Sequence, residues 1–203
     1  MYNKNNILFF YAIVYFAFLY LPVMLLPVFS FNDAIHMVFP LKGFTLKWYD
    51  QMIHSSRLHR ALMNSVKVGV IASIFSTFIA LLAAKAFTKY KVKLRQLSYG
   101  AILLPFVIPE IIIAVSLIVL WTGMGLQLGL VPVTISHILF CTPFCMLVLI
   151  SRMEGFDRNL EEAAMDLGEN AWGTFWRVTF PLALPAIVAS LLLSFVISFD
   201  EFI

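Results

Sequence analysis

The sequence predicts an all-α, polytopic membrane protein, because it is rich in apolar residues, poor in charges and divided into long charge-free runs. Hydrophobic residue types make up 62% of the 203 residues and charged types 12%, which is about half the charged share of a soluble domain. A soluble core of this size could not bury so many apolar side chains, so a disordered chain and an ordinary soluble domain are both excluded. The runs are far longer than barrel strands, so we expect the membrane spans to be helices.

Five spans are expected, because about 20 apolar residues in a helix cross the hydrocarbon core of a bilayer. The first run is too long for the apolar part of a cleaved signal peptide, so we expect it to remain as an anchor. Between Arg95 and Arg152 the only charged residue is Glu110, and the glycine-rich segment 122–132 is the expected turn within this stretch. The expected spans are 7–31, 66–87, 98–121, 131–150 and 180–202.

Lysine and arginine predict the orientation of the chain, because they are enriched in cytoplasmic loops. Segment 85–96 carries five of them and no acid, so we expect it, the N-terminus and the loop 152–178 to be cytoplasmic. Segment 32–65 is then external. With five spans the chain ends on the external side beside an acidic pair, and we expect a sixth helix to be missing there.

The external segment includes residues 44–62, which resemble an amphipathic pair of helices beginning at Thr45 and Ser56. This pair could contact an external protein or lie at the membrane interface. The chain therefore divides into an N-terminal part, residues 1–63, with the anchor helix and this amphipathic segment, and a membrane core, residues 64–203.

The loop 152–178 is predicted to form two short helices joined by a sharp bend. Asp157 is a typical residue for the N-terminal cap of the first helix, and Gly168 suits the left-handed position that ends it. We expect a second short helix over residues 171–178, before Pro181 begins the last span. One face of the first helix, at a spacing of three to four residues, combines small and apolar side chains: Leu160, Ala163, Ala164 and Leu167.

The charge of this loop favours a protein partner over the membrane surface. The loop contains six acidic and three basic residues, and an acidic helix is repelled by an anionic leaflet. Two alanines keep one face of the first helix slim, so that it could enter a groove on another protein. The alternative is that both helices simply lie on the inner surface of the membrane.

The same loop resembles the "EAA" loop of ATP-binding-cassette (ABC) importer permeases with the MetI-like fold. The matching residues are Glu162, Ala163, Ala164, Gly168, Pro181, Leu182 and Pro185, and Asn64 and Ser65 open the second span as the core of that family does. Segments 43–49, 155–157 and 198–201 are similar to the permease subunits of spermidine/putrescine importers. This similarity is less specific than the loop motif and is spread over several segments. Such permeases have six helices, one more than this chain would have.

The resemblance implies a bacterial inner-membrane complex of two permeases, a dimer of a cytoplasmic ATPase and an external solute-binding protein. It implies that ATP and magnesium bind to the ATPase, and this sequence has no phosphate-binding loop of its own. By the resemblance, the residues that couple to the ATPase are Glu162, Ala163, Ala164, Leu167 and Gly168. The chain is then a transport subunit and not an enzyme, and its net charge of +3 gives no reason to expect nucleic acid.

Three acids are candidates for a path that attracts polyamines. Glu110 lies near the middle of the third expected span, where a charge costs ~3 kcal/mol or more unless it faces a partner or a wet cavity. Asp200 and Glu201 follow the last span. The alternatives for Glu110 are an ion pair with Lys67 or Lys85, or a protonated carboxyl, and for the other two an ordinary charged helix end.

Other functions fit the sequence less well. A related importer could carry an aminophosphonate, thiamine or ferric ion, although an aminophosphonate would require basic groups that the spans hardly offer. A channel would require a filter loop or a ring of charges, and an embedded enzyme would require a nucleophile with a base or a metal set. Cys141, Cys145 and His137 are expected to be packed side chains rather than ligands.

Overall fold

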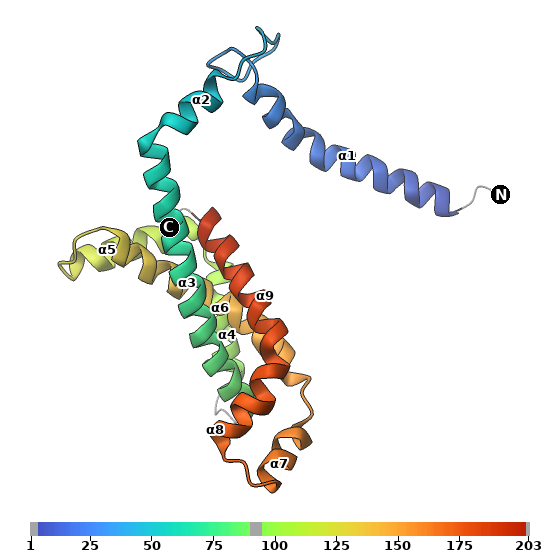
Figure 1. Cartoon of the computed structure of the whole chain (residues 1–203), viewed down its shortest axis with the longest axis vertical. Coiled ribbons are helices and arrows are strands. Elements are labelled where there is room, and N and C mark those ends of the chain that lie inside the picture. The colour runs from blue at the N-terminus through green and yellow to red at the C-terminus, as the bar shows by residue number, and fades with distance from the viewer. Residues whose placement is uncertain (1–3, 90–94, 202–203) are drawn as a thin grey trace. The chain divides into compact units, whose positions relative to one another are not determined.

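The structure is a computed structural model that describes residues 4–89 and 95–201 (Figure 1). Within these residues the regular secondary structure is entirely helical, and the one β-type pairing is an isolated bridge between Asn32 and Phe44. This confirms the predicted fold class. The elements are α1 (Lys4–Ser30), α2 (Lys47–His54), α3 (Ser56–Lys89), α4 (Arg95–Val107), α5 (Glu110–Gly123), α6 (Leu130–Glu154), α7 (Arg158–Asp166), α8 (Ala171–Thr174), the π-helical turn η1 (Phe175–Thr179) and α9 (Phe180–Asp200).

The described helices provide four uninterrupted candidate membrane spans, and a fifth if α4 and α5 are taken together as one broken span. The uninterrupted helices are Asn6–Ser30, Ser56–Lys89, Leu130–Glu154 and Ala171–Asp200. Three of these, Ser56–Lys89, Leu130–Glu154 and Ala171–Asp200, are longer than predicted. The expected amphipathic helix at Ser56 is the beginning of the α3 span, and the expected short helix over residues 171–178 continues into α9.

The third expected span, residues 98–121, is not a continuous helix. It is bent by 100° between Val107 and Glu110, and Figure 1 shows α5 leaving the direction of α4 at this point. Pro109 explains the break, because it has no amide hydrogen to donate and it disfavours the helical conformation of Ile108. Its own backbone is extended, with φ −56° and ψ 132°, and α5 begins immediately after it.

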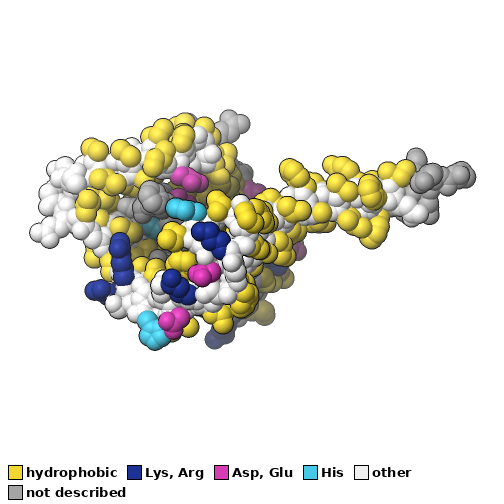
Figure 2. Space-filling view, turned by 90° about the horizontal axis from the view of Figure 1, so that it is seen from above, with side chains coloured by type: hydrophobic (Ala, Val, Ile, Leu, Met, Phe, Trp, Pro, Cys, Tyr) yellow, Lys and Arg dark blue, Asp and Glu magenta, His cyan; other side chains and the backbone are white. Residues whose placement is uncertain are grey.

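The described chain divides into two compact units between Arg60 and Ala61. In the first unit α1 has an apolar surface along its length, with its visible side chains in Figure 2 hydrophobic. The loop after α1 is organised around Asn32, whose side-chain oxygen accepts a hydrogen bond from the Lys42 amide at 2.8 Å and whose carbonyl accepts one from the Trp48 indole at 2.9 Å. Asn32 is buried although it is polar, and its side-chain nitrogen has no hydrogen-bond partner among the described residues.

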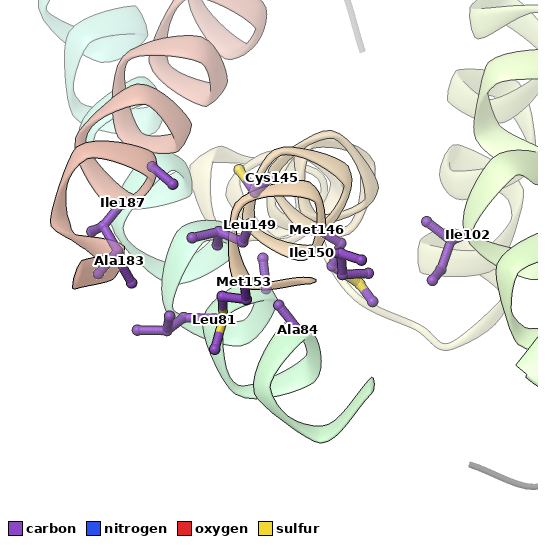
Figure 3. Packing of buried hydrophobic residues seen from close by; sticks show 12 residues of the cluster. Leu81, Ala84, Ile102, Cys145, Met146, Leu149, Ile150, Met153, Ala183 and Ile187 are labelled. Atoms are coloured by element: carbon purple, nitrogen blue, oxygen red, sulfur yellow. The ribbon is translucent and has the colours of Figure 1, made fainter. Parts of the chain in front are cut away.

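The second unit is a bundle in which α6 is central. Met146 and Ile150 of α6 lie toward Ile102 of α4, while Leu149 and Met153 lie toward α3 and α9 (Figure 3). Leu149 is fully buried, and its neighbours in the cluster include three small residues with no exposed surface: Ala80, Ala84 and Ala183. Small side chains let membrane helices approach closely, which supplies the packing that stabilises them in lipid.

Cysteine and serine side chains continue this close packing along α6 and α9. Cys145 Sγ lies 3.6 Å from the Ser190 carbonyl oxygen, and Cys141 Sγ lies 3.7 Å from the Ser194 carbonyl oxygen. Both thiols are free and fully buried. His137 is also buried, and its Nδ1 lies 2.8 Å from the Ser198 hydroxyl. The prediction that these three residues are packed side chains is therefore confirmed.

We expect Ala80→Leu to destabilise the bundle by about 1–3 kcal/mol, because the larger side chain has no space between α3 and α6. The free energy of unfolding, measured by denaturant titration in mixed micelles, checks this. Ala101→Leu, the same substitution at an exposed position of α4, serves as the control and should change that free energy by less than about 0.5 kcal/mol. Equal effects of the two substitutions would contradict the packing described for α3 and α6.

Candidate functional site

The loop helix α7 begins and ends at residues that fix its length. The Asp157 carboxylate accepts a hydrogen bond from the Asn159 amide at 3.0 Å, which satisfies a free donor of the first turn. At the other end Gly168 has φ +95°, its amide donates to the Met165 carbonyl at 2.9 Å, and the Glu169 amide donates to the Ala164 carbonyl at 3.1 Å. This paired arrangement is a Schellman ending. The predicted cap and the predicted left-handed glycine are both confirmed.

The outer face of α7 exposes most of the residues that the sequence assigned to coupling. Leu167 is 88% exposed, and Ala163 and Glu162 are exposed as well, whereas Ala164 is half-buried. Glu162 has no ion pair within the described part of the chain. Leu167 is an exposed apolar side chain at the end of a short acidic helix, and another protein could cover it.

Glu161 lies differently from its neighbour Glu162, and the sequence alone did not single it out. Its Oε2 lies 3.2 Å from Lys89 Nζ at the end of α3, and its Oε1 accepts a hydrogen bond from the Thr179 hydroxyl in η1. The signal in the sequence is the acidic pair itself, because consecutive helical residues point about 100° apart and the two carboxylates therefore point in different directions.

The charge state of Glu161 follows from these contacts. Burial raises the pKa of its carboxyl, but the hydrogen bonds from Thr179 and Lys89 and the positive charges of Lys89 and Lys85 outweigh it, so the pKa lies below its ordinary value of 4.5. The folded protein therefore favours the ionised form. This contribution to stability is complete above the ordinary pKa and is lost only as the pH falls through the lowered one, so the carboxylate is charged at neutral pH.

The segment after the bend joins the last span without a break. Asn170 caps α8 by accepting a hydrogen bond from the Gly173 amide at 2.8 Å, and the helix then passes through η1 into α9. Pro181 has no amide to donate to the Arg177 carbonyl, and its ring would clash with that carbonyl in a regular α-helix. The wider π-helical turn accommodates the proline, which is why the structure has one 30-residue helix where the sequence suggested two.

A pocket of about 480 Å³ lies between α7 and the adjoining ends of α3 and α9. Its lining includes Lys85, Lys89, Glu161, Thr179 and Leu182. The Lys85 ammonium lies over the Phe175 ring, 4.2 Å from its centroid. The loop 152–178 and the end of α3 are therefore at the same end of the bundle, in agreement with the single side predicted for both from the basic residues.

The three acids proposed for a substrate path all lie at helix ends. Glu110 is exposed at the first residue of α5, directly after the break, where a negative charge is favoured by the helix dipole. Asp200 is exposed at the last residue of α9, and Glu201 follows it half-buried. Within residues 4–89 and 95–201, no ion pair joins Glu110 to Lys67 or Lys85.

Metal binding has no candidate in the described residues, which contain no group of three or more His, Cys, Asp or Glu side chains that could hold an ion. The geometry is that of a polytopic helical membrane protein that presents a short, capped helix outside the bundle.

Residues 76–203 match the family described as the binding-protein-dependent transport system inner membrane component. The chain belongs to this family. The comparison confirms the predicted class of membrane transport component, which is not an enzyme.

Individual relatives agree with this assignment. The chain is 36% identical over 186 residues to the spermidine/putrescine transport system permease protein PotC of Escherichia coli K12. The aligned region covers 92% of this chain and 70% of that protein. It is 34% identical over 191 residues to PotC of Haemophilus influenzae, covering 94% of this chain and 74% of that protein. A crystal structure of a bacterial ABC transporter that imports the acidic polysaccharide alginate has the same fold, with a TM-score of 0.69 at 18% identity, covering 98% of this chain and 73% of that one.

We expect Gly168→Ala to loosen the end of α7 by about 1–2 kcal/mol, because an L-residue at positive φ places its Cβ against the backbone. Hydrogen exchange in nanodiscs checks this, with faster exchange expected at the amides of residues 167–169. Gly100→Ala, inside α4 with open space around its added Cβ, should leave exchange in α7 unchanged. Identical exchange in the Gly168 variant and the unmodified protein would contradict the left-handed ending.

Proposed function

We propose that this chain is the permease subunit of an ATP-driven importer of polyamines and forms half of the path for spermidine or putrescine. The observation that carries the proposal is the outer face of α7. It presents the EAA-type residues on a capped helix, in a chain that is similar along nearly its whole length to permeases of spermidine/putrescine transport systems. A second permease subunit supplies the other half of the path.

The proposed complex places α7 in a cleft of a cytoplasmic ATPase, which binds ATP and magnesium. The acidic helix meets basic groups of the ATPase through Glu162, and Leu167 fills an apolar contact. A solute-binding protein delivers the substrate from outside. The basic segment 85–96 supports a bacterial inner-membrane protein with its N-terminus and the loop 152–178 in the cytoplasm.

The acids fit the charge of a polyamine. A break in a membrane helix exposes backbone groups that require water or a ligand as partners, and Glu110 stands at such a break. Together with Asp200 and Glu201 it provides a route that attracts cations. An aminophosphonate would be repelled by the same three charges.

The direct test is uptake of radiolabelled spermidine and putrescine by the complete complex reconstituted in proteoliposomes. We expect ATP-dependent accumulation of at least one of them. Accumulation of an aminophosphonate, thiamine or ferric ion, with neither polyamine taken up, would contradict the proposed substrate class.

For the coupling face, we expect Ala163→Trp to reduce polyamine uptake at least tenfold and to separate ATP hydrolysis from transport, because an indole cannot enter the space that an alanine leaves. Uptake and phosphate release are measured together in proteoliposomes. Ala171→Trp, the same increase in size at an exposed position outside α7, is the matched control. Uptake by the Ala163 variant equal to that of the control would contradict docking through this face.

For the substrate path, we expect Glu110→Gln or Asp200→Asn to raise the KM for polyamine uptake roughly tenfold, which corresponds to a loss of about 1.4 kcal/mol of attraction. Asp50→Asn, at an exposed carboxylate of α2, is the control for the loss of one negative charge. Unchanged KM values in both path variants would contradict an acidic route.

A further inference from the structure

We propose that Glu161 is a positioning residue that fastens α7 to the bundle, so that a displacement of α7 by the ATPase moves α3 and α9 directly. This inference rests on the proposed coupling of α7 to an ATPase. It assigns different tasks to two adjacent carboxylates: Glu162 faces the partner protein, and Glu161 faces the bundle.

The contacts of Glu161 join three elements through one side chain. Lys89 is the last residue of α3, Glu161 lies in α7, and Thr179 is the last residue of η1, directly before α9. Each carboxylate oxygen has its own partner, with Lys89 Nζ 3.2 Å from Oε2 and the Thr179 hydroxyl bonded to Oε1. We refer to Lys89, Glu161 and Thr179 as the α7 anchor.

The surroundings of the α7 anchor strengthen these contacts. The side chains of Glu161 and Lys89 are 25% and 33% exposed, so the pair is partly removed from water and is less screened than a surface ion pair. Lys85 adds a second positive charge near the carboxylate, while its own ammonium is held over the Phe175 ring.

The backbone connects α7 to the bundle through two glycine-containing links. Gly155 lies between α6 and α7, and Gly168 lies between α7 and α8. Since glycine has little restriction on its backbone angles, such links can bend when α7 is displaced. If the links bend, part of the displacement of α7 does not reach the bundle. A side-chain connection that bypasses both links transmits that displacement, and the α7 anchor is such a connection within the described residues.

The experiment is a double-mutant cycle on the complete complex in proteoliposomes, with Glu161→Ala, Lys89→Ala, Thr179→Val and their pairs. The quantity measured is the number of polyamine molecules imported per ATP hydrolysed. We expect each single variant to lower this ratio at least threefold. Each pair should be no worse than its more severe member, because the members act through one connection. Thr179→Ser, which keeps the hydroxyl, should retain the ratio of the unmodified complex.

Two controls test whether the mutant cycle reports on the α7 anchor. Asp166→Asn removes an exposed carboxylate from the same helix, and its effect should be additive with that of Lys89→Ala. A photo-crosslinker attached to the cysteine of Leu167→Cys reports whether α7 still contacts the ATPase. Within this chain the reagent reacts at that position, because the other two cysteines are fully buried. We expect this crosslink to persist when Glu161→Ala is added.

The outcomes separate the two proposals. A lowered transport ratio with the crosslink retained and non-additive pairs supports the α7 anchor. Additive pairs, an unchanged ratio in Glu161→Ala, or loss of the crosslink on adding Glu161→Ala would overturn it. Absence of the crosslink from the complex that carries Leu167→Cys alone would instead overturn the proposed docking of α7.

Discussion

The close contact of α3, α6 and α9 determines where the functional features of this protein lie. In a bilayer apolar side chains gain little by leaving lipid for protein, so helices associate where their backbones can approach and make dense contacts. Ala80, Cys145, Ala183 and Ser190 provide that approach here, because none of them has exposed surface. Since α3 ends and α9 begins at the same end of the bundle, this contact also brings Lys89 and Thr179 within reach of a third element.

The loop 152–178 contains a stiff helix, α7, between two glycine-containing links. Its helix is closed at both ends by local hydrogen bonds, which makes α7 internally stiff, and Gly155 and Gly168 lie in the links beside it. In a transporter of this family the energy source and the substrate path belong to different polypeptides. A helix that is internally stiff and is joined to the membrane helices through Glu161 is suited to carry a displacement between them.

Much of the fold could be predicted from the sequence, because charges and prolines act locally. The charge-free runs located the spans, and Asp157 and Gly168 located the ends of α7, since a cap and a left-handed glycine depend on a few adjacent residues. The 100° bend was less accessible. Pro109 indicates an interruption of the helix, but the angle at which α5 leaves depends on the packing of the whole unit. Glu161 could not be assigned from sequence, because its partners are 72 and 18 residues away and meet only in the folded bundle.

The π-helical turn before Pro181 sets the rotational phase between the loop and the last membrane helix. A π turn contains one residue more than the corresponding α turn, and one helical residue corresponds to a rotation of about 100° and a rise of about 1.5 Å. Removing one residue from 175–179 would turn everything before it by about that angle relative to α9. Asn170, Trp172 and the entry to α7 would then face another direction. The length of this short segment, and not only the residues on α7, therefore determines which way the loop faces.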